Sequence, residues 1–173
     1  MVAMRIIQNK QHNEHGLDLT SIVGKDRKNL SGAALRSFVN IAEIWQLAEK
    51  ERLIVLGQPA RSTYYSWIEK ASKKDDITLP LDVLLRISAM LGIYKALRII
   101  FHDREQSVKW LLSSNKGSSF AGQSPKEIML SGTPDGLMLV RRFLDAWRGG
   151  LFVGPNEEAQ QIMPIEPNDI VIV

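Results

Sequence analysis

Residue types that commonly perform catalysis are sparse in this chain of 173 residues. It contains no cysteine, which excludes disulfides, thiolate nucleophiles and cysteine-ligated zinc. Of the three histidines His12, His15 and His102, only the first two are close, in a polar stretch typical of a solvated tail. Adjacent carboxylates at 75–76 and 157–158 lie in similarly polar stretches, and no glycine loop for binding phosphate follows a strand. We therefore expect a protein that is not an enzyme and that has no metal site and no cofactor.

A different chemistry is available to residues 59–71, which combine cationic and hydroxyl side chains at helical spacing. Arginine and lysine neutralise phosphates or bind guanine, and hydroxyls hydrogen-bond phosphates and base edges. The predicted DNA-binding residues are Arg61, Ser62, Thr63, Tyr65, Lys70 and Lys73. Residues 49–74 carry six basic and three acidic side chains, a modest excess of +3 that also fits a merely solvated helix face.

The elements around these residues predict a helix-turn-helix, in which one helix enters the major groove and its neighbour braces it. Helices are expected at about 49–56 and 59–71. Gly57 ends the first, and Pro59 lies at or near the first position of the second. The residues of the second helix predicted to face the core are Tyr64, Trp67 and Ile68.

Apolar residues three and four apart predict helices through the rest of the body. The first is expected at 32–47 with Ser31 as its N-cap. The others are 81–91, a separate helix from 93 to about 103 after a break at Gly92, 104–112, a short helix from Ser124-Pro125 to Gly132, and 136–148. Residues 133–136 are either a turn or a second helix start.

The predicted fold is therefore all-α. It divides into a flexible N-terminal arm (1–30), a helix-turn-helix domain (31–103), a small helical domain (104–150) and an extended C-terminal tail (151–173). Three prolines and a final Ile-Val-Ile-Val favour extended chain in the tail.

Charge is distributed unevenly along the chain. Residues 151–173 hold four acidic side chains and no lysine or arginine, so their charge is −4 and the net charge of +3 leaves +7 for the first 150 residues. This asymmetry favours two different binding partners, one of them a polyanion that binds the basic first 150 residues. Neither a run of about 18 apolar residues nor a secretory signal is present, so a cytoplasmic location with no membrane partner is expected.

Several motifs in order resemble one known family. The stretch 56–67, with Arg61-Ser62-Thr63-Tyr64-Tyr65, is similar to the helix-turn-helix of Xre/MbcA/ParS-type antitoxins. The downstream series looks like the toxin-binding domain of the same antitoxins: Arg86-Ile87-Ser88, 91–97, Phe101, Trp110-Leu111, Phe120, Gly122, Ser124-Pro125, Met129, Gly132, Val140, Leu144, Trp147 and Gly149-Gly150. The likeness covers about 32–150. One departure is the turn at 57–61, where the family commonly places an apolar residue directly after the glycine.

The resemblance implies the antitoxin of a type II toxin–antitoxin system. Its partner would be a RES-domain toxin that consumes NAD, neutralised by direct binding and steric block of its active site. The resemblance also implies binding to operator DNA, which represses the shared operon. The toxin-binding residues expected are Gly122, Ser124, Arg141, Trp147, Glu157, Glu158, Glu166 and Asp169. An NAD site usually presents cationic groups to the pyrophosphate, so the acidic tail is compatible with lying across its mouth.

Other interpretations remain open. Gly122 and Ser124 could serve only to start a helix, and Trp147 could serve only to close the core. The tail could be an inert segment with no binding role. A helix-turn-helix transcription regulator without a toxin partner is the main alternative function, and a protein-interaction adaptor is the next. A homodimer is expected because helix-turn-helix proteins usually read two half-sites, with an interface on 80–91 or 93–101.

Overall fold

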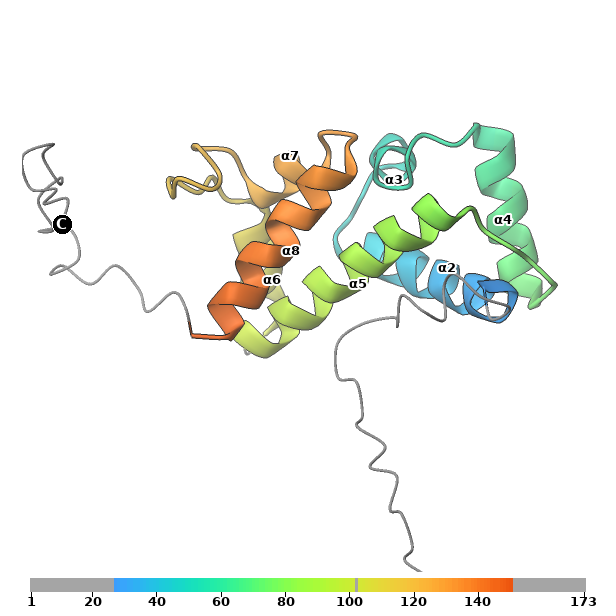
Figure 1. The fold of residues 1–173 in the computed structure, drawn as a ribbon, viewed down its shortest axis with the longest axis horizontal. Helices are drawn as coiled ribbons and strands as arrows, with labels where there is room; N and C mark the ends of the chain where they lie inside the picture. Colours follow the sequence, from blue (N-terminus) through green and yellow to red (C-terminus); the bar gives the residue numbers. More distant parts are fainter. Residues whose placement is uncertain (1–26, 102, 151–173) are drawn as a thin grey trace, which may run out of the picture.

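The structure is a computed structural model that describes residues 27–101 and 103–150 (Figure 1). Every regular element in these ranges is a helix, which confirms the all-α prediction for this part of the chain: α2 (Arg27–Ile44), α3 (Glu49–Val55), α4 (Arg61–Lys73), α5 (Leu81–Ile100), α6 (Arg104–Leu112), α7 (Pro125–Met129) and α8 (Pro134–Arg148). None of them is long and apolar enough to cross a membrane. Residues 1–26 of the predicted arm (1–30) and the predicted tail (151–173) lie outside the described residues, while residues 27–30 form the first turn of α2.

Helix α5 is the central element of the fold (Figure 1). It packs against α2 on one side and α8 on the other, while α4 packs on α2, and α6 and α7 complete the side that contains α8. The part expected to bind DNA and the part expected to bind a toxin therefore share one long helix.

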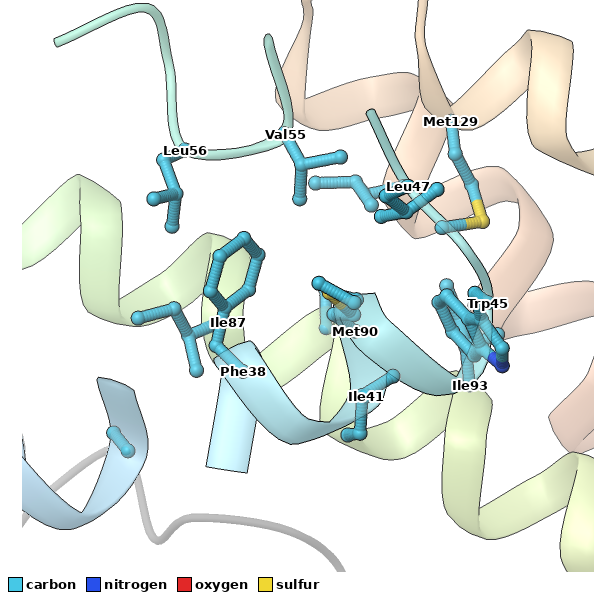
Figure 2. Close-up of a cluster of buried hydrophobic side chains, with 14 of the residues drawn as sticks. Phe38, Ile41, Trp45, Leu47, Val55, Leu56, Ile87, Met90, Ile93 and Met129 are labelled. Atoms are coloured by element: carbon cyan, nitrogen blue, oxygen red, sulfur yellow. The ribbon is translucent and has the colours of Figure 1, made fainter. Parts of the chain in front are cut away.

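The buried side chains form one cluster that spans both sides of α5. Met90 and Ile93 of α5 are fully buried and pack near Phe38 and Ile41 of α2, and Met129 from α7 reaches the same cluster (Figure 2). Burying each such side chain contributes about 1.5–3 kcal/mol. The two sides are thus held to each other by a continuous apolar core.

The expected N-cap at Ser31 is wrong, because α2 begins at Arg27 and contains this residue. Ser31 is fully buried, and its hydroxyl donates to the Arg27 carbonyl at 2.7 Å while accepting from the Leu79 N–H at 3.0 Å. The serine therefore satisfies a buried amide of the segment leading into α5. The same helix ends at Ile44, before the expected 47, because Gln46 takes a positive φ of 52°.

The expected helix break at Gly92 is also wrong, since α5 runs without interruption from Leu81 to Ile100. An interior glycine costs a helix about 1 kcal/mol, less than the burial of Met90 and Ile93 beside it contributes. A Cβ at position 92 would lie 2.8 Å from Nε of Arg141. The glycine gives this arginine of α8 room to cross α5.

The turn between α3 and α4 is longer than expected. Gly57 and Gln58 both have positive φ values, 85° and 60°, so Pro59 lies in the turn and α4 starts at Arg61 with Ala60 as its N-cap. The helix therefore starts slightly later than the predicted position at or near Pro59. The helix at 104–112 is confirmed, and residues 133–136 are a helix start with Thr133 as the N-cap of α8.

Candidate functional site

The predicted DNA-binding residues all lie exposed on α4, and the structure brings two of them together. Nε of Arg61 lies 2.6 Å from Oε1 of Glu49, at the start of α3. The Tyr65 hydroxyl donates to the other oxygen of the same carboxylate at 2.8 Å. Glu49 thus holds both side chains at the N-terminal end of α4, a role that the sequence analysis did not assign to it.

These hydrogen bonds keep Glu49 ionised. The bonds from Tyr65 and then Arg61 lower the pKa of the Glu49 carboxyl below its usual value, and the bond to Glu49 raises the pKa of the Tyr65 hydroxyl. The side chain of Arg61 is 71% exposed, so exchange of Glu49 for a phosphate oxygen requires little rearrangement. In this arrangement the carboxylate of Glu49 neutralises Arg61, so a phosphate would have to displace it.

The remaining predicted DNA-binding residues are spread along α4. Ser62 and Thr63 lie exposed in its first turn, next to Arg61. Lys70 and Lys73 lie in the last turns, where Lys73 forms an exposed ion pair with Glu69 at 2.6 Å. The core-facing prediction is confirmed for Tyr64, which is 4% exposed, while Trp67 and Ile68 are half-buried against the core.

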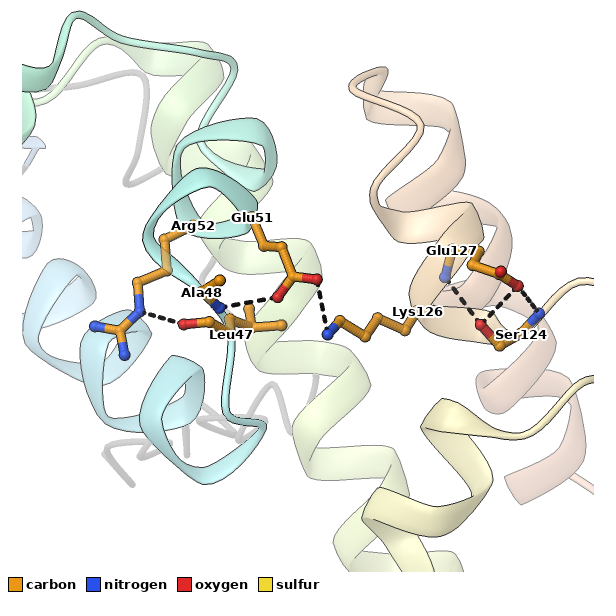
Figure 3. A network of polar contacts seen from close by, with 7 residues as sticks. All are labelled: Leu47, Ala48, Glu51, Arg52, Ser124, Lys126 and Glu127. Atoms are coloured by element: carbon orange, nitrogen blue, oxygen red, sulfur yellow. Dashed lines mark hydrogen bonds and ion pairs between the residues drawn. The ribbon is translucent and has the colours of Figure 1, made fainter.

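The two predicted toxin-binding residues at the start of α7 have structural roles (Figure 3). Ser124 caps the helix: its hydroxyl accepts from the Glu127 N–H at 3.2 Å, and the Glu127 carboxylate accepts from the Ser124 N–H at 2.7 Å. This reciprocal pair confirms the predicted helix start, and such a cap contributes about 1 kcal/mol. Gly122 lies in the preceding turn with φ 86°, and its N–H donates to the Asn115 carbonyl.

An ion pair that the sequence did not reveal joins the two sides of the molecule at α7. Nζ of Lys126 lies 2.8 Å from Oε1 of Glu51, while the other oxygen accepts from the Ala48 N–H at 2.9 Å (Figure 3). Burial raises the pKa of the Glu51 carboxyl, but these two hydrogen bonds and the lysine charge outweigh it and lower the pKa overall. Helix α3 of the predicted helix-turn-helix is thereby attached to α7.

The other two predicted toxin-binding residues in the described part, Arg141 and Trp147, lie on different faces of α8. Six helical positions separate them, which turns the side chains about 120° apart. Nη1 of Arg141 donates to the Ser88 carbonyl on α5 at 3.4 Å. Trp147 packs edge-on against Phe101, with ring centroids 5.8 Å apart, and also contacts Trp110.

Trp147 is one member of an aromatic cluster that closes the core between α5, α6 and α8. Phe120 is fully buried at its centre, and its ring centroid lies 4.7 Å from that of Phe143. Trp110 stacks on Phe143 at 6.1 Å. Trp147 is half-buried in this cluster, so its packing role is established. The acidic residues predicted to bind the toxin lie outside the described residues: Glu157, Glu158, Glu166 and Asp169.

Comparison with known proteins identifies the C-terminal helices. Residues 96–150 match the family described as the antitoxin Xre/MbcA/ParS C-terminal toxin-binding domain. The matched segment runs from the last turns of α5 through the whole of α6, α7 and α8. Residues 96–150 are therefore a toxin-binding domain of this antitoxin family, and this domain implies an antitoxin role in a toxin–antitoxin system, with a toxin as its partner.

A similar protein is the uncharacterized protein y4oB of Sinorhizobium fredii (strain NBRC 101917 / NGR234). The two sequences are 40% identical over 118 residues, which cover 68% of this chain and 86% of y4oB. No solved structure matches the chain.

Proposed function

We propose that this antitoxin neutralises a RES-domain toxin that consumes NAD, and that it does so by binding the toxin and blocking its active site. The toxin-binding domain at 96–150 is the observation that carries the proposal. The antitoxin itself performs no chemistry in this account. The RES identity of the toxin rests on the resemblance of the helix-turn-helix and toxin-binding motifs to Xre/MbcA/ParS-type antitoxins.

The same protein is proposed to bind operator DNA through α4 and to repress the operon that encodes it and the toxin. The support is the exposed row of cationic and hydroxyl side chains on α4, which begins with Arg61 at a solvent-facing corner. DNA recognition of this kind usually uses two copies, so the proposal includes a homodimer within a larger complex with the toxin. Both partners place the protein in the cytoplasm.

The C-terminal segment 151–173 is proposed to contribute to the block. Its charge of −4 suits the cationic groups that usually surround the pyrophosphate of NAD. Deleting 151–173 and measuring the remaining toxin inhibition tests this part alone. Weakened inhibition with retained binding is the expected result, and full inhibition by the shortened protein rejects the role of the tail.

Co-expression in bacteria tests the function as a whole. The reading frame beside this gene is expressed from an inducible promoter, alone and together with the antitoxin, and growth and cellular NAD are measured. The expected result is arrested growth with NAD depletion for the neighbour alone, and recovery of both when the antitoxin is present. A harmless neighbour, or arrest that the antitoxin does not relieve, contradicts the proposal and favours a regulator without a toxin partner.

A further inference from the structure

An apolar groove of about 240 Å³ lies between α5 and α8. Leu85 and Ala89 of α5 form one wall, and Leu137 and Met138 of α8 form the other. A groove of this size is smaller than the roughly 300–1,000 Å³ of typical small-molecule sites, so it fits one or two side chains of a protein better than a cofactor.

Leu85 is an exposed apolar residue on a helix whose other apolar side chains are mostly buried. Most apolar side chains of α5 are buried, but Leu85 is 40% exposed at the open side of the groove. Pockets that bury an apolar anchor of the partner often dominate the energetics of protein interfaces. Ala33 of α2 is also exposed, does not line the groove and lies outside the matched domain at 96–150, which makes it a suitable comparison.

Two arginines line the groove, and one of them, Arg86, has a buried nitrogen without a hydrogen-bond partner in the described ranges. The side chain of Arg86 is only 10% exposed, and its Nε has no hydrogen-bond partner within the described ranges, although Oδ2 of Asp82 lies 3.4 Å away. Its Nη1 makes a long bond of 3.3 Å to the Gly132 carbonyl. Arg141 makes a bond of 3.4 Å to the Ser88 carbonyl, and its Nε lies 3.6 Å from Oδ2 of Asp145. A buried donor without an acceptor is costly, and two guanidinium groups at one groove attract a carboxylate of a partner.

The position of the groove indicates which partner supplies that carboxylate. Its α8 wall, including Arg141, lies within the matched toxin-binding domain at 96–150. Its α5 wall belongs to the helix that also packs against α2. A partner seated there contacts the toxin-binding domain and the central helix at once.

We propose that the α5–α8 groove receives an apolar side chain of the toxin, with a neighbouring acidic residue of the toxin paired with Arg86 and Arg141. This inference rests on the proposed antitoxin function, because it names a contact within that complex. It adds a specific anchor point that shares no residue with the aromatic cluster around Trp147.

The test compares two substitutions in the full chain that each add a carboxylate at an exposed helix position. Leu85→Asp removes the apolar wall and places a carboxylate beside both arginines, while Ala33→Asp adds the same charge on α2, outside the groove and outside the matched domain. Affinity for the protein encoded by the adjoining reading frame is measured by titration calorimetry. Leu85→Asp is expected to weaken binding at least tenfold and Ala33→Asp less than twofold, with both variants showing the circular dichroism of the original protein.

The outcomes separate the groove from the function. Equal affinity of both variants, with the unaltered antitoxin binding its partner, overturns the groove contact and leaves the antitoxin role intact. Absence of binding by the unaltered antitoxin overturns both. A photo-crosslinking amino acid at position 85 gives a second readout that does not depend on the folding of Leu85→Asp. A cross-link to an acidic peptide of the neighbour supports the proposal, and one to residues 151–173 or to a second copy overturns it.

Discussion

Lys126 of α7 and Glu51 of α3 form an ion pair at 2.8 Å, and their side chains are only 20% and 24% exposed. This contact attaches the toxin-binding domain to the first helix of the predicted helix-turn-helix, because α7 lies in one and α3 in the other. Because both parts also pack on helix α5, we expect them to unfold together.

The first prediction concerns the strength of this ion pair. Lys126→Ala, Glu51→Ala and the double variant form a thermodynamic cycle in urea unfolding. We expect a coupling of about 0.5–1 kcal/mol, at the upper end for ion pairs near the surface, because both side chains are three-quarters buried. Lys116→Ala, an exposed lysine of the loop before α7, serves as the control and is expected to change stability by less than about 0.5 kcal/mol. A coupling energy near zero would show that the ion pair does not stabilise the contact between α3 and α7.

The second prediction concerns pH. The pKa of Glu51 lies below its usual 4.5 in the folded protein, so ionised Glu51 favours the folded state at every pH above that value. As the pH falls from about 5 toward the lowered pKa, protonation of the carboxyl removes this stabilisation. The free energy of unfolding, measured between pH 6 and pH 3, should therefore fall more steeply for the original protein than for Glu51→Gln. Parallel pH profiles of the two proteins refute this role for Glu51.

The third prediction compares two helical glycines. A Cβ at Gly136 would lie 2.1 Å from the Ile128 carbonyl oxygen, a backbone atom that cannot move without disturbing α7. At Gly32 the nearest atoms are 3.4 Å and 3.6 Å away, which is ordinary contact. Gly136→Ala is expected to lower the free energy of unfolding by roughly 2 kcal/mol or more, while Gly32→Ala raises it by up to about 1 kcal/mol. Thermal melts of the two variants that shift in the same direction disagree with this packing.

The fourth prediction tests the DNA surface. Arg61→Ala should weaken binding to the upstream DNA and reduce the slope of log K against log salt by about 0.9, the value for one phosphate contact. Lys109→Ala on α6 removes another exposed cation, far along the chain from α4, and controls for net charge. Electrophoretic or fluorescence titrations at several salt concentrations supply the slopes. Equal effects of the two substitutions indicate non-specific attraction only.

Periodicity and local capping made most of the helices predictable. The start of α7 was correct because Ser124, Pro125 and Glu127 act within one turn of chain, and such local hydrogen bonds leave a direct trace in the sequence. The same local reasoning failed at Ser31, whose partner is the Leu79 N–H, 48 positions away. It failed at Gly92 because burial across α5 and α8 outweighs a local helix penalty.

The candidate site was predictable only in part for the same reason. Exposed side chains of α4 followed from helical spacing, but Glu49 as the partner of Arg61 depends on how α3 and α4 are oriented. The α5–α8 groove and the contact of Lys126 with Glu51 arise from packing between segments far apart in sequence. Pattern alone carries no signal for such pairs.

The most direct test of the account is the effect of the purified antitoxin on its neighbour's enzymatic activity. The protein encoded by the adjoining frame is incubated with NAD, and NAD loss is followed while increasing amounts of the antitoxin are added. The account predicts that NAD consumption stops at a fixed molar ratio of antitoxin to toxin. NAD consumption that continues unchanged at a saturating excess contradicts it.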